Sequence, residues 1–162
     1  MLSGSLCSAL AWIVLQAEDA PDLLQSAPAS AGTVRNAKLF AAIAPVLALV
    51  GLPVLWLAWS RPLAGGLAAF TICGIGLGAA LIVMWAGKPG SRDKFNARGQ
   101  RNGMAIVLEL SHLLGWGALA FLLPLAAGMA QVRASMMLGI AAAATVALAM
   151  PSLAYLLRHR AR

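Results

Sequence analysis

The sequence predicts an all-α protein: a polytopic membrane helix bundle with four full spans and a shortened N-terminal hydrophobic helix. Of the 162 residues, 61% are hydrophobic and only 10% are charged, whereas a soluble domain carries roughly 25% charged residues. Lipid rather than water is therefore the expected surroundings of most side chains. Four long apolar runs and the clustering of the cations between them also support this fold class.

Each apolar run exceeds the roughly 20 residues that a helix needs to cross about 30 Å of hydrocarbon. Helices are expected because an open strand would leave its backbone unpaired in lipid. The sequences "SRP" and "QVR" form tight turns after the first and third runs, and a longer polar loop, "GKPGSRDKFNARGQRNG", follows the second. The four expected spans are Leu39–Trp59, Leu63–Ala86, Met104–Ala130 and Ala134–Leu157.

The distribution of the cations predicts the orientation of the spans. Of the 12 Lys and Arg residues, only Arg61 and Arg133 lie in the two tight turns, and all the others fall on the opposite side of the membrane. Because cytoplasmic loops carry the excess of cations, the long loop and the C-terminus are expected in the cytoplasm. The expected location is the bacterial inner membrane, as a multi-pass protein.

The N-terminal stretch Leu2–Leu15 is too short to cross the bilayer comfortably. It resembles the end of a span whose beginning is missing, and an interfacial helix is the alternative. A cleaved signal is disfavoured because no Lys or Arg precedes the apolar stretch. The expected organisation is a hydrophobic helix at 1–16, a cytoplasmic segment with a short helix at 17–38, a four-helix transmembrane domain at 39–157 and a basic tail at 158–162.

The acidic segment "EDAPDLLQSAPAS" interrupts this apolar chain at 18–30. Asp19 can cap a short helix, with Asp22 in its first turn, and both carboxylates then lie at the positive end of the helix dipole. This helix would present Leu23 and Leu24 as a small apolar patch. An ordinary polar loop with one helical turn is the alternative interpretation.

This segment and the following "VRNAKLFAAIAPVLAL" resemble a segment of bacterial ABC-2-type exporter permeases. The long basic loop is similar to an inner loop of some members, so the resemblance extends over nearly the whole chain. It implies that the short helix is a coupling helix, in which Asp19, Asp22, Leu23 and Leu24 bind a separate ATPase subunit. The permeases of this family carry more spans than this chain, which implies a truncated form.

Glu109 and His112 are the only ionisable residues well inside an expected span, and they share one helix face. An intramembrane acid is a functional candidate by default. Three readings remain open: pairing of Glu109 with loop cations such as Arg98 or Arg101, a polar residue on a substrate path, and a metal ligand. A di-iron site would need a second copy of this motif and further carboxylates, which the sequence lacks.

Gly74 and Gly78 have the GxxxG spacing that lets a second helix approach closely. The close contact is expected either within the chain or in a dimer. Neither Cys7 nor Cys73 belongs to a CxxC pair, and we expect no metal and no cofactor.

The function expected from these patterns is a transmembrane permease-type subunit of an ATP-driven export complex. The alternative is a small non-transporting membrane protein, either an accessory subunit or an assembly factor. The sequence contains no phosphate-binding GxxxxGK[ST] loop, so any ATPase is a separate polypeptide. The expected partners are the lipid bilayer, an ABC-type ATPase, and a second copy of the chain or a second permease subunit. We expect no nucleic-acid binding and no enzyme activity.

Overall fold

The computed structural model describes residues 2–16, 30–86, 103–129 and 131–157, and this part of the chain folds into helices without strands. Four helices are long and apolar enough to span a membrane. The fifth, at the N-terminus, is apolar but shorter. The helices are α1 (Leu2–Gln16), α3 (Ala31–Ser60), α4 (Pro62–Ala86), α5 (Gly103–Ala127) and α6 (Ala134–Leu157).

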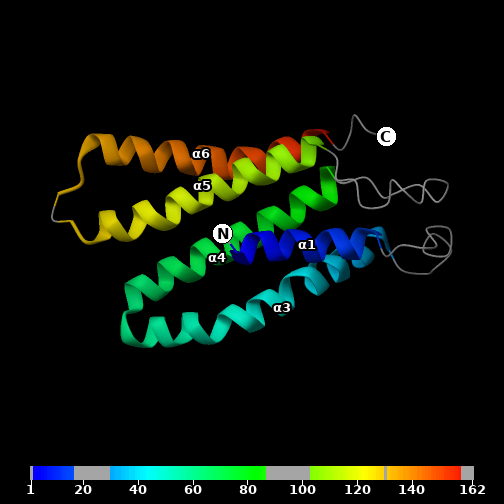
Figure 1. The fold of residues 1–162 in the computed structure, drawn as a ribbon, viewed down its shortest axis with the longest axis horizontal. Helices are drawn as coiled ribbons and strands as arrows, with labels where there is room; N and C mark the ends of the chain where they lie inside the picture. Colours follow the sequence, from blue (N-terminus) through cyan, green and yellow to red (C-terminus); the bar gives the residue numbers. More distant parts are fainter. Residues whose placement is uncertain (1, 17–29, 87–102, 130, 158–162) are drawn as a thin grey trace.

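The long helices form two antiparallel hairpins, α3–α4 and α5–α6, which lie side by side (Figure 1). α1 packs against α3 and α4 over about half of their length (Figure 1). The last residues of α1, α4 and α6 and the first residues of α3 and α5 lie at one end of the bundle, which we call the loop end (Figure 1). The two tight turns lie at the opposite end, the hairpin end.

These dimensions confirm the expected fold class of an all-α bundle with four spans and one shortened helix. At 1.5 Å per residue, α4, α5 and α6 are each about 36–38 Å long, which exceeds the roughly 30 Å of hydrocarbon in a bilayer. α1 is only about 22 Å long and cannot cross it. The protein is therefore a multi-pass membrane protein in contact with lipid.

The first spanning helix begins earlier than the sequence suggested. α3 starts at Ala31 rather than at Leu39, so the last residues of the segment assigned to 17–38 belong to the helix. The Ser30 hydroxyl accepts a hydrogen bond from the Thr33 backbone N–H at 3.2 Å, which caps this start. Gly32 is thus a residue of the first turn of α3.

α4 is the centre of the bundle, because it contacts all four other helices in the described part of the chain. It contributes to three separate apolar clusters. One cluster joins it to α1 and α3, and the other two join it to α5 and α6. The three clusters are Ala11, Ala42, Ala80 and Val83; Ile75, Leu113, Trp116, Leu119, Ala143 and Ala147; and Ile82, Leu108 and Ala154.

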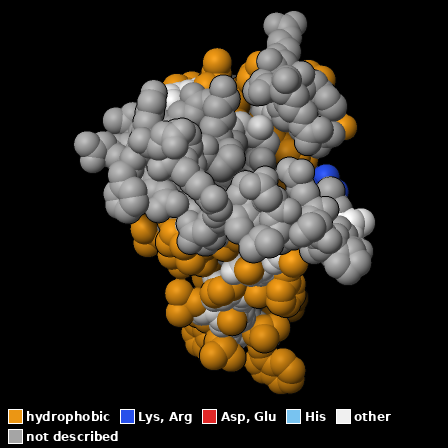
Figure 2. All heavy atoms as spheres, turned by 90° about the vertical axis from the view of Figure 1, so that its right-hand side faces the viewer, with side chains coloured by type: hydrophobic (Ala, Val, Ile, Leu, Met, Phe, Trp, Pro, Cys, Tyr) orange, Lys and Arg blue, Asp and Glu red, His pale blue; other side chains and the backbone are white. Residues whose placement is uncertain are grey.

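α3 is much more exposed than α4. Only 11% of the most apolar 18-residue stretch of α3 is buried inside the structure, whereas 44% of the corresponding stretch of α4 is buried. Its exposed side chains are large and hydrophobic, such as Phe40, Leu52 and Trp59. In Figure 2, which views the loop end, the described side chains visible around the grey residues are mostly hydrophobic, with a few Lys or Arg atoms at one edge. The exposed apolar face of α3 suits lipid or another membrane protein.

The arrangement of helix ends predicts that the loop between α4 and α5 and the turn between α5 and α6 lie on opposite sides of the membrane. Single cysteines at Asn96, which lies outside the described residues, and at Arg133 would be introduced after replacing Cys7 and Cys73 with alanine. An impermeant thiol reagent should label them from opposite sides in oriented vesicles. Labelling of both from the same side would contradict the four-span topology.

Candidate functional site in the membrane core

Glu109 and His112 of α5 are both buried in the middle of the bundle. His112 is 1% exposed and Glu109 is 6% exposed. His112 lies about 14 Å along the helix axis from Gly103, well inside the hydrocarbon. Polar side chains are costly at this depth unless they are paired, so their partners determine what this site can do.

The partner of His112 follows from a proline in α6. In an α-helix each carbonyl accepts a hydrogen bond from the N–H four residues later. The residue four positions after Ala147 is Pro151, which has no N–H to donate. The His112 Nδ1 atom lies 2.8 Å from the Ala147 carbonyl oxygen. His112 therefore donates the hydrogen bond that Pro151 cannot.

This contact fixes the state of the imidazole. A carbonyl oxygen can only accept a hydrogen bond, so Nδ1 carries the proton. In the neutral ring Nε2 then holds a lone pair, and it has no hydrogen-bond partner among the described residues. His112 is thus a donor toward α6, and its Nε2 atom faces α4.

A glycine on the same face of α5 lets α6 come close enough for this bond. Gly115 lies one turn after His112, and a Cβ atom built on it would be 2.9 Å from the Ala147 nitrogen. Real Cβ atoms do not approach backbone atoms this closely. The short reach of the imidazole is sufficient only because the two backbones are in contact at Gly115 and Ala147.

The other side of the His112 ring packs against α4. A Cβ atom on Gly78 would collide with the imidazole, and one on Gly74 would collide with the indole of Trp116. The GxxxG spacing of these glycines therefore serves a contact within the chain. The Trp116 ring also meets Phe70 edge to face, with ring centroids 5.4 Å apart. We call His112, Ala147, Pro151, Gly78 and Gly115 the histidine tie, because one side chain joins α4, α5 and α6.

The histidine tie is a closely packed contact of three helices. No group of three or more His, Cys, Asp or Glu side chains that could hold a metal occurs in the described residues. Two cavities lie beside α3 and α4, and their linings are almost entirely apolar. The histidine tie can hold α4, α5 and α6 at fixed positions along one another.

The remaining sequence-based candidates fall partly outside the described residues. Two stretches that carry candidates, 17–29 and 87–102, lie outside the described residues. The first contains Asp19, Asp22, Leu23 and Leu24, and the second contains Arg98 and Arg101. The coupling helix and the pairing of Glu109 with loop cations therefore remain predictions. Glu109 itself is buried one turn closer to the loop end than His112.

The sequence analysis singled out neither Ala147, Pro151 and Gly115 of the histidine tie nor Trp116 beside it. Trp116 is 6% exposed and lies in the core. Its position near the middle of α5 was the available signal. Ala147 has no signal of its own; only its position four residues before Pro151 identifies its carbonyl as one that needs a donor.

No family model matches the chain, and neither does any curated protein or solved structure.

The histidine tie predicts that His112 and Pro151 are energetically coupled. His112→Phe keeps an aromatic ring but removes the donor, and should lower the stability of the protein in detergent by about 1–2 kcal/mol. In a Pro151→Ala background the Ala147 carbonyl regains a helical donor, so the same substitution should cost clearly less. Equal costs in the two backgrounds, measured by reversible unfolding, would show that the hydrogen bond contributes nothing.

Gly78 and Gly66 provide a matched pair of substitutions in α4. Gly78→Ala should lower the thermal unfolding midpoint, because its methyl group collides with His112 and overpacking costs about 1–3 kcal/mol. A Cβ on Gly66 meets nothing within 4 Å, so Gly66→Ala should leave the midpoint unchanged or raise it. A Gly78→Ala protein as stable as Gly66→Ala would contradict the close contact.

Proposed function

We propose that this chain is a transmembrane permease-type subunit of an ATP-driven export complex in the bacterial inner membrane, and that it works with a separate ATPase subunit. The observation that carries the proposal is the meeting of helix ends at the loop end of the bundle. The acidic stretch 17–29 is bounded by the end of α1 and the start of α3, and both lie there (Figure 1). The basic loop 87–102 is bounded by helix ends at the same place.

This arrangement supports a docking surface for a soluble partner. The acidic and basic segments of the chain both begin and end at one membrane surface, within reach of one partner. The positive-inside rule makes that surface the cytoplasmic one, where ATP is available. The resemblance of "EDAPDLLQSAPAS" to the coupling segment of ABC-2-type permeases favours an ATPase as the partner.

The packing of the core supports the role of a subunit rather than of a complete transporter. α4, α5 and α6 are closely packed around the histidine tie, and two apolar cavities lie beside α3 and α4. A path for a polar substrate would then run between this chain and another membrane subunit. The large exposed apolar surface of α3 is suited to such a neighbour.

A non-transporting accessory subunit is the second candidate function. The same closely packed core favours it, because a bundle held in one register by His112 is suited to serve as a rigid scaffold. The two candidates differ in one respect: the accessory subunit needs a membrane partner but no ATPase.

The proposal predicts that an ABC-type ATPase co-purifies with the tagged chain from native membranes in mild detergent. Replacing both Leu23 and Leu24 with alanine should weaken this association at least tenfold, since each fully buried leucine contributes roughly 1.5–3 kcal/mol. Membrane insertion should be unchanged. The matched control replaces Leu138 and Leu148, which are exposed on α6 at the surface expected to face lipid, and should retain the ATPase.

Full retention of the ATPase by the Leu23 and Leu24 variant would contradict the coupling-helix role. Recovery of another membrane protein without any ATPase would instead support the accessory-subunit candidate.

A further inference from the structure

A second feature of the fold, independent of the histidine tie, is an apolar groove between α3 and α4. The groove has a volume of about 490 Å³ and is lined by one face of α3, from Asn36 to Leu47, and by Leu77 of α4. Its lining is almost wholly hydrocarbon, with Asn36 as the polar residue at one end. We call it the α3–α4 groove.

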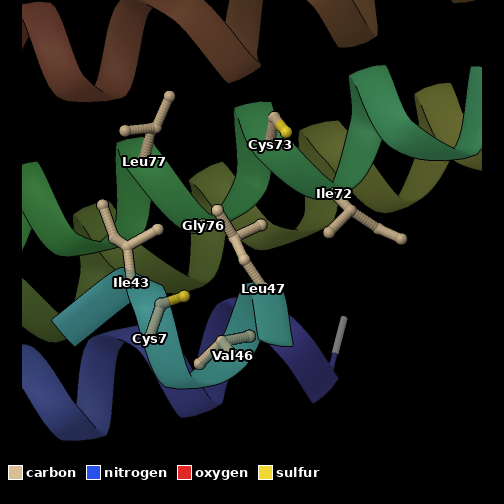
Figure 3. Close-up of a pocket in the computed structure, with 8 residues that line it drawn as sticks. All are labelled: Cys7, Ile43, Val46, Leu47, Ile72, Cys73, Gly76 and Leu77. Carbon is tan, nitrogen blue, oxygen red and sulfur yellow. The ribbon is translucent and has the colours of Figure 1, made fainter. Parts of the chain in front are cut away.

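The α3–α4 groove adjoins a smaller cavity of about 80 Å³. Ile43, Leu47 and Leu77 line both spaces, so the two are adjacent. The cavity leads inward toward Cys7 of α1 and Gly76 of α4, and its lining side chains come from three helices (Figure 3). Its small volume accommodates the end of a hydrocarbon chain but not a protein helix.

The length of the groove matches one leaflet of a bilayer. The distance along α3 from Asn36 to Leu47 is about 16 Å, and half of the roughly 30 Å hydrocarbon core is about 15 Å. The groove begins near the loop end, within two turns of the start of α3, and runs toward the middle of the membrane. An acyl chain of a lipid in the loop-end leaflet would lie along it with its headgroup at Asn36.

Charges at the open end of the groove determine which headgroup fits. Arg35 is exposed beside Asn36, one turn before the groove residue Leu39. The N-terminus of α3 carries the positive end of the helix dipole. No Asp or Glu occurs in α3. Arg35 and the helix N-terminus therefore favour a phosphate group at this end of the groove.

We propose that the α3–α4 groove binds one anionic glycerophospholipid of the loop-end leaflet, with an acyl chain along Phe40, Ala44 and Leu47 and the phosphate beside Arg35 and Asn36. A lipid fits better than a second copy of the chain for three reasons. A cation lies at the open end of the groove, the groove is about as long as the hydrocarbon of one leaflet is thick, and the adjoining cavity is large enough only for the end of a hydrocarbon chain. The proposal does not depend on export or on an ATPase partner.

The test measures lipid retained by the purified chain in native mass spectrometry, after exchange into detergent containing equal amounts of phosphatidylglycerol and phosphatidylcholine. The wild-type chain should retain phosphatidylglycerol in preference to phosphatidylcholine. Ala44→Phe fills the groove and should abolish retention of both lipids. Its control is Ala48→Phe, which adds the same ring to an exposed position of α3 outside the groove and should retain lipid as the wild type does.

Arg35→Gln should lower the preference for phosphatidylglycerol by about fivefold, because one cation near the membrane surface contributes about 1 kcal/mol. Its control, Arg133→Gln, removes an exposed cation at the hairpin end and should leave the preference intact. Equal retention by the Ala44→Phe and Ala48→Phe variants would overturn the proposal. A wild-type chain that shows no preference between the two lipids would also overturn the proposal. The same holds if the wild-type chain is a dimer and Ala44→Phe disrupts the contact between the two copies.

Discussion

The described core depends on one backbone carbonyl that a proline leaves without its helical donor. Pro151 cannot bond to Ala147, and an unpaired carbonyl in hydrocarbon costs several kcal/mol. His112 supplies the donor at 2.8 Å, and this requirement fixes the ring's tautomer and the close approach of α5 to α6. The glycines at 78 and 115 are needed because a side chain at either position would prevent the same contact.

This constraint divides the bundle into two parts with different properties. α4, α5 and α6 share a histidine that is buried among them, and their relative register is set by it. α1 and α3 pack against the opposite face of α4 through small residues, such as Ala11, Ala42 and Ala80. Most of α3 remains exposed to its surroundings. The bundle therefore has one closely packed half and one half that leaves a large apolar surface exposed.

Composition and hydrophobic run length were sufficient to predict the number of long apolar helices and their approximate bounds. They could not predict the start of α3, because a Ser30 cap and a Gly32 in a first turn resemble the residues of a loop. The sequence also identified His112 as unusual within a span. It could not pair His112 with Ala147, because the two are 35 residues apart and only the packing of α5 on α6 brings them together.

The central claim is that His112 donates to the Ala147 carbonyl. Solid-state nuclear magnetic resonance of the chain in lipid bilayers, with nitrogen-15 in histidine and carbon-13 in the alanine carbonyls, tests it directly. The account predicts a proton on His112 Nδ1 and a correlation between that nitrogen and the Ala147 carbonyl carbon. The correlation should be absent in a control sample in which Ala147 carries no carbon-13 label. A His112 ring with its proton on Nε2 and a bare Nδ1, or an Nδ1–H with no contact to Ala147, would contradict the account.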